Sequence, residues 1–301
     1  MMLTKLGISN MLIFFMLLSP SLKAQQDDLM SMLDSMVEPK TNYAEATFKS
    51  SRIINGHSVE RVQSKQLHFR ISHRFGQVNL GWRELWGIDR AIMYMSFEYG
   101  ISDKLMVGLG RTNELKTYHG FYKYTIARQS SGARNMPVSI SLHSSISVNS
   151  VKWNNPQKDE DFNGRISYTH QLPVARKMNE NLSLQITPSY VHRNLVDNPA
   201  LPNDLYVVGL GGRYKLTKWV SVNAEYFYVI PPFDEEKEFN NRNNLSFGFD
   251  IETGGHVFQL HITNSRSMIE PYFIGNTTDK WLDGGIYFGF NLLRVFALGG
   301  N

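Results

Sequence analysis

The sequence predicts an all-β protein, an antiparallel transmembrane β-barrel of about 12 strands with a short N-terminal periplasmic helix and hairpin. Two observations predict it. Short segments alternate apolar and polar residues, most clearly from Leu245 to Glu252, and the connections between them alternate in length. Because successive side chains of a strand point to opposite faces, each segment has one apolar and one polar face. Apolar faces toward lipid and polar faces toward a lumen are typical of outer-membrane barrels.

The N-terminus has the pattern of a secretory signal peptide. Lys5 precedes the apolar run 11–18, and Pro20 ends it before a polar start near residue 25. The run is too short to span a bilayer, and no later stretch of about 18 apolar residues follows. We therefore interpret residues 1–24 as a signal peptide, and we expect the mature chain in the outer membrane.

Composition excludes several classes of function. The sequence has no cysteine, so disulfides, thiolate metal sites and cysteine nucleophiles are excluded. Two of the 31 basic residues leave with the signal peptide, and the remaining 29 nearly balance 27 acidic ones. The charge thus gives no reason to expect nucleic acid as a partner. A mean hydropathy of −0.29 suits a barrel, whose apolar band averages out along an alternating strand.

Residues 25–64 form the predicted periplasmic segment. The part before Asn42 has leucines and methionines on one side of a short helix, where we expect them to pack. Segments 43–54 and 57–62 flank the dipeptide Asn55-Gly56, which suits a type I′ turn. They predict a hairpin ahead of the barrel, and residues 65–301 form the predicted barrel.

Twelve strands are predicted within the barrel region. Their ranges are 65–75, 91–101, 104–112, 121–129, 137–149, 163–173, 181–194, 205–216, 219–230, 243–252, 256–264 and 284–296. Tight turns follow the second, eighth and tenth strands, whereas the intervening connections are long. Short turns on one side and long loops on the other are the signature of outer-membrane barrels, with the short turns periplasmic.

Face assignment separates a lipid side from a lumenal side. The predicted lipid-facing residues are Ala91, Met93, Met95, Phe97 and Tyr99, Leu182, Leu184, Ile186 and Tyr190, Val220, Val222, Ala224, Tyr226 and Tyr228, and Ile286, Phe288, Phe290 and Leu292. Charges lie on the opposite faces, where they need water or each other. The candidate lumen-lining residues are Arg70, Glu98, Arg165, Arg213, Glu225, Asp250 and His261.

The C-terminal half carries a specific resemblance. Its residues are the stretch Ser246–Ser265, together with His73-Arg74-Phe75-Gly76, Arg111, Lys123-Tyr124, Gly275-Asn276-Thr277, Phe288-Gly289-Phe290-Asn291 and Arg294-Val295-Phe296. Over residues 43–298 the chain resembles an uncharacterised Bacteroidota-type outer-membrane β-barrel family, a domain of unknown function. The resemblance implies fold and location but no reaction. Many bacterial barrels end on an aromatic residue, whereas here five residues follow Phe296.

One pattern points to an enzyme. His143 and Ser145 have the spacing used by an outer-membrane phospholipase. However, the apolar residues Ile140, Leu142 and Ile146 take the lipid side, so His143 and Ser145 are predicted to face the lumen, where no acyl chain arrives. We therefore predict no enzymatic activity and keep a phospholipase-like hydrolase as a minor alternative.

Three other patterns predict packing or solvation rather than chemistry. None of the nine histidines forms an i, i+2 or i, i+4 pair, and His170 and His192 are expected at opposite membrane ends, so no metal or cofactor is predicted. Gly209, Gly211 and Gly212 precede no helix, so close packing is favoured over a phosphate cradle. The acidic runs 159–161 and 234–238 suit solvated outer loops, with divalent cations shared with lipopolysaccharide as the alternative.

Two functions remain open from the sequence. The first is a narrow channel or passive transporter for small polar solutes, in which Arg70, Arg165 and Arg213 face Glu98, Glu225 and Asp250 across the lumen. The second is a non-transporting structural or partner-binding barrel whose lumen is plugged by the same charges, with a periplasmic protein as partner. In both, outer-membrane lipid and lipopolysaccharide surround the barrel.

Overall fold

The computed structural model describes residues 40–152, 162–196, 201–231 and 241–298. Within them the chain forms two units, a small sheet of β1 (Thr41–Tyr43) with β6 (Ser130–Gly132), and a barrel. The predicted signal peptide and most of the predicted N-terminal helix fall outside these residues. Among the described residues, no helix is long and apolar enough to cross a membrane.

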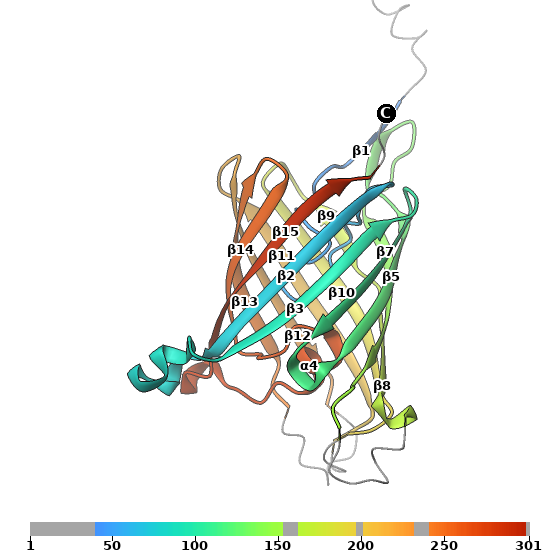
Figure 1. Cartoon of the computed structure of the whole chain (residues 1–301). Helices are drawn as coiled ribbons and strands as arrows, with labels where there is room; N and C mark the ends of the chain where they lie inside the picture. Colours follow the sequence, from blue (N-terminus) through green and yellow to red (C-terminus); the bar gives the residue numbers. More distant parts are fainter. Residues whose placement is uncertain (1–39, 153–161, 197–200, 232–240, 299–301) are drawn as a thin grey trace, which may run out of the picture. The chain divides into compact units, whose positions relative to one another are not determined.

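The barrel closes on itself. Its strands are β2 (Gln66–Gln77), β3 (Ala91–Gly100), β4 (Leu105–Thr112), β5 (Tyr118–Ala127), β7 (Ser139–Val148), β8 (Ile166–Gln171), β9 (Val174–Lys177), β10 (Leu182–Arg193), β11 (Asp204–Lys215), β12 (Val220–Val229), β13 (Asn244–Thr253), β14 (His256–Thr263) and β15 (Tyr287–Ala297). All pairings are antiparallel, and the last strand pairs with β2 (Figure 1). Because β8 and β9 both lie between β7 and β10, they form one interrupted strand, and the described residues confirm the predicted 12 strands.

Pro173 explains the interruption. Proline has no backbone N–H to donate, so a ladder stops where it would have to continue through one. The pairing with β10 ends at Gln171 and resumes at Val174. The prediction ended this strand at residue 173, and the structure extends it to Lys177.

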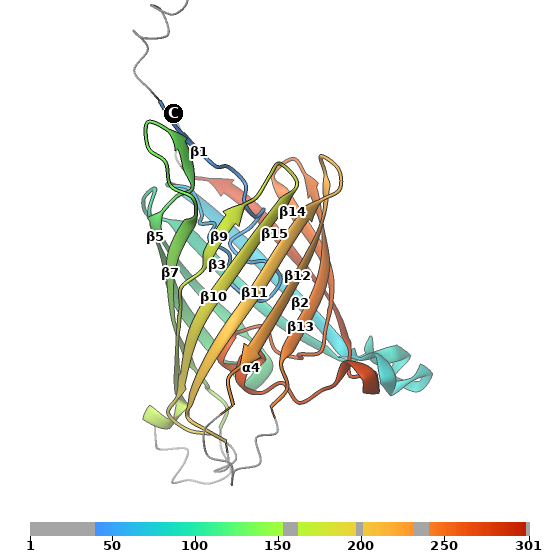
Figure 2. The same ribbon diagram turned by 180° about the vertical axis from the view of Figure 1, so that it is seen from behind.

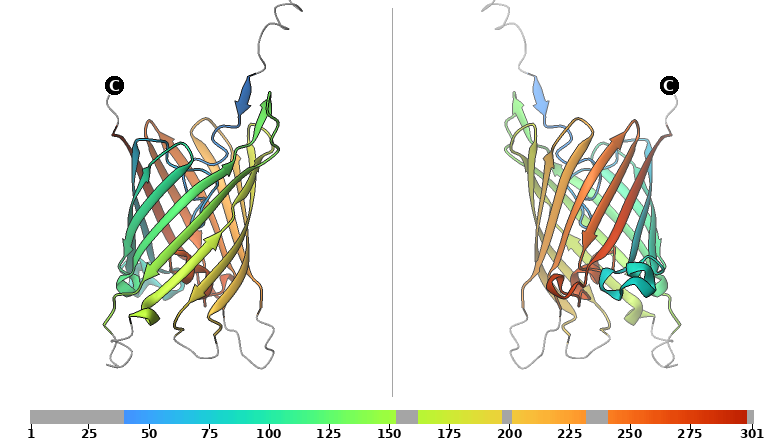
Figure 3. Two further views of the ribbon diagram at one scale, coloured as in Figure 1. Left: turned by 90° about the vertical axis from the view of Figure 1, so that its right-hand side faces the viewer. Right: turned by 90° about the vertical axis from the view of Figure 1, so that its left-hand side faces the viewer.

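Connection length alternates around the barrel as predicted (Figures 1, 2 and 3). One end carries the short turns, including residues 101–104, 216–219 and 254–255. The long connections at the other end contain η1 (Val78–Leu80), η2 (Trp82–Gly87), η3 (Glu114–Lys116), η4 (Asn163–Arg165), α4 (Glu270–Gly275) and η5 (Trp281–Asp283).

The two faces of the wall have the predicted character. Phe97 and Phe249 are 55% and 51% exposed on the outside, whereas their chain neighbours Glu98 and Asp250 are 0% and 5% exposed. The pleat that sends adjacent side chains to opposite faces produces this contrast.

Residues 44–64, which we call the lumenal segment, lie inside the barrel. The segment enters where the amide of Ala44 donates to the Gln129 carbonyl at 2.8 Å, and it leaves where Lys65 donates to the Gly100 carbonyl at 2.9 Å. Both positions are at the end with the short turns, and the segment is visible in blue within the barrel (Figures 2 and 3).

A turn forms at the predicted place in this segment, but its setting differs. The amide of Ile53 donates to the Gly56 carbonyl at 2.8 Å, and Arg52 and His57 form a single bridge rather than two flanking strands. The expected hairpin ahead of the barrel instead occupies the lumen, because the wall supplies partners for its backbone.

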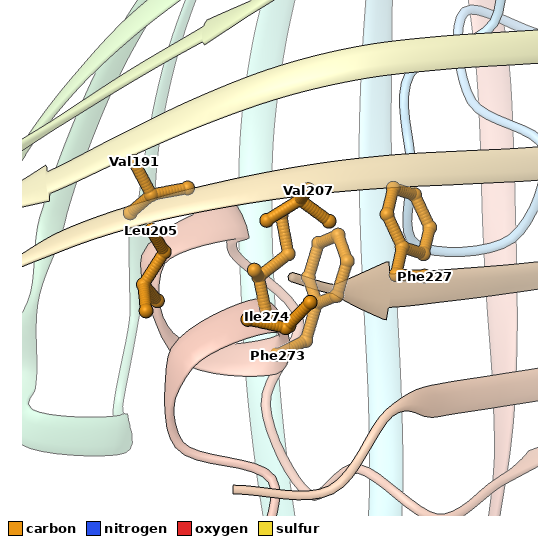
Figure 4. Close-up of a cluster of buried hydrophobic side chains, with 7 residues drawn as sticks. Val191, Leu205, Val207, Phe227, Phe273 and Ile274 are labelled. Carbon is orange, nitrogen blue, oxygen red and sulfur yellow. The ribbon is translucent and has the colours of Figure 1, made fainter. Parts of the chain in front are cut away.

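The other end of the lumen is closed by α4. All six residues of this helix are buried, and Phe273 and Ile274 pack on an apolar patch of the inner wall (Figure 4). The patch consists of Val191, Leu205, Val207, Phe227 and Val229. The sequence predicted an outer loop over residues 265–283, whereas burial of this apolar area draws its central part into the barrel.

Candidate functional site: the closed lumen

Lys123, on β5, holds the lumenal segment from one side. Its ammonium group is 0% exposed and donates to the carbonyl oxygens of Ser51, Ser58 and Glu60 at 2.8, 2.8 and 2.7 Å. An ammonium group has three donors, and all three are used here. A buried charge is tolerated only when its hydrogen bonds are made, so this pocket is built for backbone carbonyls.

Glu225, on β12, binds the tip of the turn as a hydrogen-bond acceptor, whereas Lys123 acts as a donor. Its carboxylate accepts from the backbone amides of Ile54 and Gly56 at 3.2 and 3.1 Å through Oε2, and from the amide of Asn55 at 2.8 Å through Oε1. Successive backbone N–H groups in a turn form a natural anion site, and here a wall residue fills it.

Three amide side chains of the wall complete the backbone pairing. Gln185 accepts from the amide of Val59 at 2.9 Å and donates to the His57 carbonyl at 2.8 Å. Gln259 donates to the Ile53 carbonyl at 2.7 Å, and Asn291 donates to that of Ile54 at 3.3 Å. The irregular backbone of the segment thus takes its hydrogen-bond partners from side chains, whereas a strand would take them from the backbone of a neighbouring strand.

Arg74 joins the two closures of the lumen. Its guanidinium is buried and donates to Asn55 Oδ1 at 2.6 Å on the lumenal segment. It also donates to the carbonyls of Ser265 and Ser267 at 2.7 and 2.6 Å, just before α4, and to His261 Nε2 at 3.0 Å. One side chain of β2 therefore fixes both elements that fill the barrel.

Among the described residues, two cavities lie at the end with the long connections. Their volumes are about 520 and 260 Å³, and both are lined by Leu115, Tyr272 and Asn276. The larger cavity also includes Glu114, whose pKa is raised by burial, with Arg266 Nε 3.5 Å from its carboxylate. Both cavities are therefore bordered by α4 and by residues of the long connections.

The structure places six of the seven candidate lumen-lining residues inside the barrel. Those six are Arg70, Glu98, Arg213, Glu225, Asp250 and His261, each at most 5% exposed. They do not face one another across an open lumen, because the lumenal segment lies between the walls. Arg70 lies 3.4 Å from Glu98 on the neighbouring strand, and Asp250 accepts from Gln259 at 2.6 Å. Instead of a screen of opposed charges, the wall presents contacts to the lumenal segment.

Arg165 differs from the expectation. It lies in η4, before β8 begins, and its Nη1 donates to the carbonyls of Asn149 and Val151 at 3.1 and 2.6 Å. It therefore supports a long connection and lines the smaller cavity rather than the lumen.

The enzyme-like pair faces inward, as the alternation predicts. His143 and Ser145 are 0% and 6% exposed, whereas the next residue along β7, Ile146, is 41% exposed on the outer face. His143 stacks on His57, with ring centroids 3.7 Å apart, and so is engaged with the lumenal segment rather than with an acyl-chain site.

The three remaining patterns have different outcomes. A Cβ on Gly211 would lie 2.3 Å from Ile53 Cδ1, and one on Gly209 2.7 Å from a Phe227 ring carbon, so close packing is confirmed. The prediction that His170 and His192 lie at opposite membrane ends is wrong. His192 pairs with Tyr168, two residues from His170, because the antiparallel strands bring these positions to the same end. The acidic runs lie outside the described residues.

Sequence reasoning placed His143 on the lumenal face but missed the group of side chains that it joins. His57, His119, His143 and Glu270 meet at its centre although they come from four different elements. A search for spacing within one strand cannot find such a group. The sequence signal was the inward face of His143 alone, because the predicted strand 121–129 left out His119, which the structure includes in β5.

Fold and site together define a membrane β-barrel whose described lumen is filled by its own chain. The chain belongs to a family described as a membrane-bound beta barrel domain (DUF5777), whose model matches residues 48–296. The match confirms an uncharacterised family of membrane-bound barrels, in agreement with the predicted outer-membrane location, while a Bacteroidota origin stays a prediction.

Comparisons with known proteins add structural likenesses. No curated protein matches the sequence. Among solved structures, a KdgM porin aligns with 77% of this chain and 99% of its own at 8% identity and a TM-score of 0.46. An outer-membrane channel from Pseudomonas putida F1 aligns with 79% of this chain and 97% of its own, at 11% identity and a TM-score of 0.46. An active-site mutant of outer membrane phospholipase A from Escherichia coli aligns with 83% of this chain and 98% of its own, at 12% identity and a TM-score of 0.44. These likenesses carry no argument about function.

Proposed function

We propose that the protein is a gated outer-membrane channel for small polar solutes, closed in this conformation by the lumenal segment. The observation that carries the proposal is that the segment enters and leaves through the same end of the barrel, beside Gln129 and Gly100. A hairpin held this way can withdraw toward the short-turn end without threading through the wall.

The wall behind the segment supports a passage for polar solutes. The residues that bind the segment are polar or charged, and they include Lys123, Gln185, Glu225, Gln259 and Asn291. After withdrawal, such groups can exchange backbone partners for water, which an apolar wall could not do. Twelve strands also enclose more room than the eight-stranded barrels that side chains alone can fill.

A second candidate, a non-transporting barrel, is favoured by α4. This helix closes the other end of the lumen, with all six of its residues buried. If α4 stays in place, withdrawal of the lumenal segment opens a cavity but no passage. The barrel would then serve as a scaffold that holds a periplasmic protein.

A reversible tether separates the two candidates. Asn55 Nδ2 donates to Ser246 Oγ at 3.0 Å, so the double variant Asn55→Cys/Ser246→Cys places a disulfide between the turn and β13 in a chain without other cysteines. We expect the oxidised protein to be electrically silent in planar bilayers, and we expect discrete openings after reduction. Each single-cysteine variant should conduct without any response to the reductant.

The contrary result is also clear. The non-transporting barrel would be favoured if no current is seen with the reduced double variant, the wild type or Lys123→Met. Heat-modifiable gel mobility must show that all three proteins are folded. Steady current through the oxidised form would show that the lumenal segment is not the gate.

A further inference from the structure

Four fully buried side chains converge where the lumenal segment, the wall and α4 meet. They are His57 of the lumenal segment, His119 of β5, His143 of β7 and Glu270 of α4, and none is more than 1% exposed. Their residue types are those that bind transition metals, since imidazole nitrogen and carboxylate oxygen are the common protein ligands besides thiolate.

The distances bring three of these groups to one point. His57 Nε2 lies 3.3 Å and His143 Nε2 lies 3.9 Å from the same oxygen, Oε1 of Glu270. The potential ligand atoms of these three residues all lie within 4.8 Å of one another. Ligands at about 2.0 to 2.2 Å from a common ion are separated by no more than about 4.4 Å, so small movements suffice to bind one.

The imidazoles lack other partners. Within the described residues, His57 Nδ1 and both ring nitrogens of His143 have no hydrogen-bond partner, while His57 Nε2 lies 3.3 Å from the Glu270 carboxylate. A buried polar group left without a partner destabilises the folded protein. Metal coordination would use one nitrogen of each ring and remove part of this destabilisation.

The second carboxylate oxygen of Glu270 is held separately. His119 Nε2 lies 3.1 Å from Oε2, and the hydroxyl of Tyr94 lies 3.0 Å from His119 Nδ1. Metal-binding carboxylates are commonly oriented by such outer partners, which leave one oxygen free to face the ion.

We propose that His57, His143 and Glu270 bind one divalent transition-metal ion of the zinc class. Two imidazoles and one carboxylate match a known zinc ligand set and leave a further coordination position open. A bound ion would link the lumenal segment, the wall and α4, which are far apart in the sequence. The proposal does not depend on whether the lumenal segment ever withdraws.

Two features of the geometry must change when an ion binds. Arg52 Nη1 lies 3.0 Å from Glu270 Oε1, and this cation competes for the oxygen. Arg52 keeps a second bond, to the Asn55 carbonyl at 2.8 Å, and its guanidinium lies over the Tyr94 and Phe121 rings. The stacked rings of His57 and His143 are inclined by only 25°, so one must rotate for both planes to contain the ion.

The competition with Arg52 gives a test that a purely structural ion pair would not pass. The full-length protein, folded in detergent and freed of metal with a chelator, is titrated with ZnCl₂ by calorimetry. We expect one tight equivalent in the wild type and at least roughly tenfold weaker binding in His143→Ala and in Glu270→Gln. Arg52→Gln should bind Zn²⁺ more tightly than the wild type, because a neighbouring positive charge is removed.

His192→Ala is the matched control. His192 Nδ1 lies 2.7 Å from Asp204 near the long-connection end, so it is also a histidine–carboxylate pair but lies outside the lumen. Its removal should leave the tight equivalent unchanged. Failure of the wild type to bind one equivalent, or retention of that equivalent in folded His143→Ala, would overturn the proposal.

A measurement on the wild type alone covers the case in which a variant does not fold. Co²⁺ replaces Zn²⁺ in nitrogen and oxygen sites and absorbs visible light when it is held in a low-coordinate geometry. We expect visible absorption bands that saturate at one equivalent and disappear on addition of Zn²⁺. A spectrum that remains that of aqueous Co²⁺ would contradict the proposed site.

Discussion

Lys123 and Glu225 bind the lumenal segment through opposite backbone groups, Glu225 at the turn and Lys123 on the residues that flank it. Lys123 donates to three carbonyl oxygens, while Glu225 accepts from three consecutive amides. Because the two side chains lie on different strands, β5 and β12, they fix both the position and the direction of the segment. Charged side chains on the predicted lumenal face thus bind the backbone of the protein itself.

Replacing Lys123 should loosen the lumenal segment. Hydrogen bonds to a charged group contribute about 1.5 to 3 kcal/mol each, and 1.4 kcal/mol corresponds to about a factor of ten. In Lys123→Met, a cysteine introduced at the buried Ile54 should therefore react with a soluble maleimide roughly ten times faster or more. The control is Lys218→Met in an exposed short turn, and an equal rate in both backgrounds would show that Lys123 does not hold the segment.

Removing the aromatic side chain of Phe273 should free α4. The ring is 0% exposed and packs edge-on against Phe227 at a centroid distance of 5.1 Å. Truncation of a buried Phe to Ala costs about 3 to 5 kcal/mol. Hydrogen exchange of residues 270–275 should then accelerate by roughly a hundredfold or more, since each 1.4 kcal/mol is about tenfold.

The matched control for that experiment is Phe288→Ala. This phenylalanine is 39% exposed on the outer face, and it does not belong to the buried apolar cluster that packs against α4. Exchange in 270–275 should not change in this variant. If both variants accelerate exchange equally, α4 depends on the whole barrel rather than on its own packing.

The face assignment can be tested on one adjacent pair. Phe249 faces lipid, so Phe249→Arg should cost roughly 2 to 4 kcal/mol if the residue lies near mid-membrane, and it should impair insertion. Asp250→Asn should be tolerated, because an amide oxygen can still accept from Gln259 Nε2. Heat-modifiable gel mobility reports the folded fraction, and equal tolerance of both changes would mean that the faces are exchanged.

The orientation in the membrane can be read from single cysteines. Long connections of outer-membrane barrels lie outside the cell and short turns lie in the periplasm. Cysteines at the exposed positions Asn276 and Asp283 should react with an impermeant thiol reagent on intact cells. Those at the exposed short-turn positions Ser102 and Lys218 should react only after the outer membrane is permeabilised, and the reverse pattern would invert the barrel.

The sequence by itself determined the wall of the barrel. Alternation with a period of two depends only on residues next to each other in the chain, so the outward Phe249 and the inward Asp250 could be assigned without any tertiary information. Turn and loop lengths are equally local, and they gave the alternating ends. The predicted strand 163–173 ended where this strand is interrupted, but the sequence analysis did not predict that the strand resumes at Val174.

Only the tertiary structure decided what fills the lumen. Lys123 binds carbonyls 63 to 72 residues away, and Arg52 meets Glu270 at a separation of 218 residues. No periodic pattern encodes such partners. The turn at Asn55 reads from sequence as a hairpin of its own, and α4, with six residues, is too short to show a helical period. Both elements lie inside the barrel because closure brings complementary polar groups and an apolar patch to one enclosed surface, and that surface does not exist before the strands have paired.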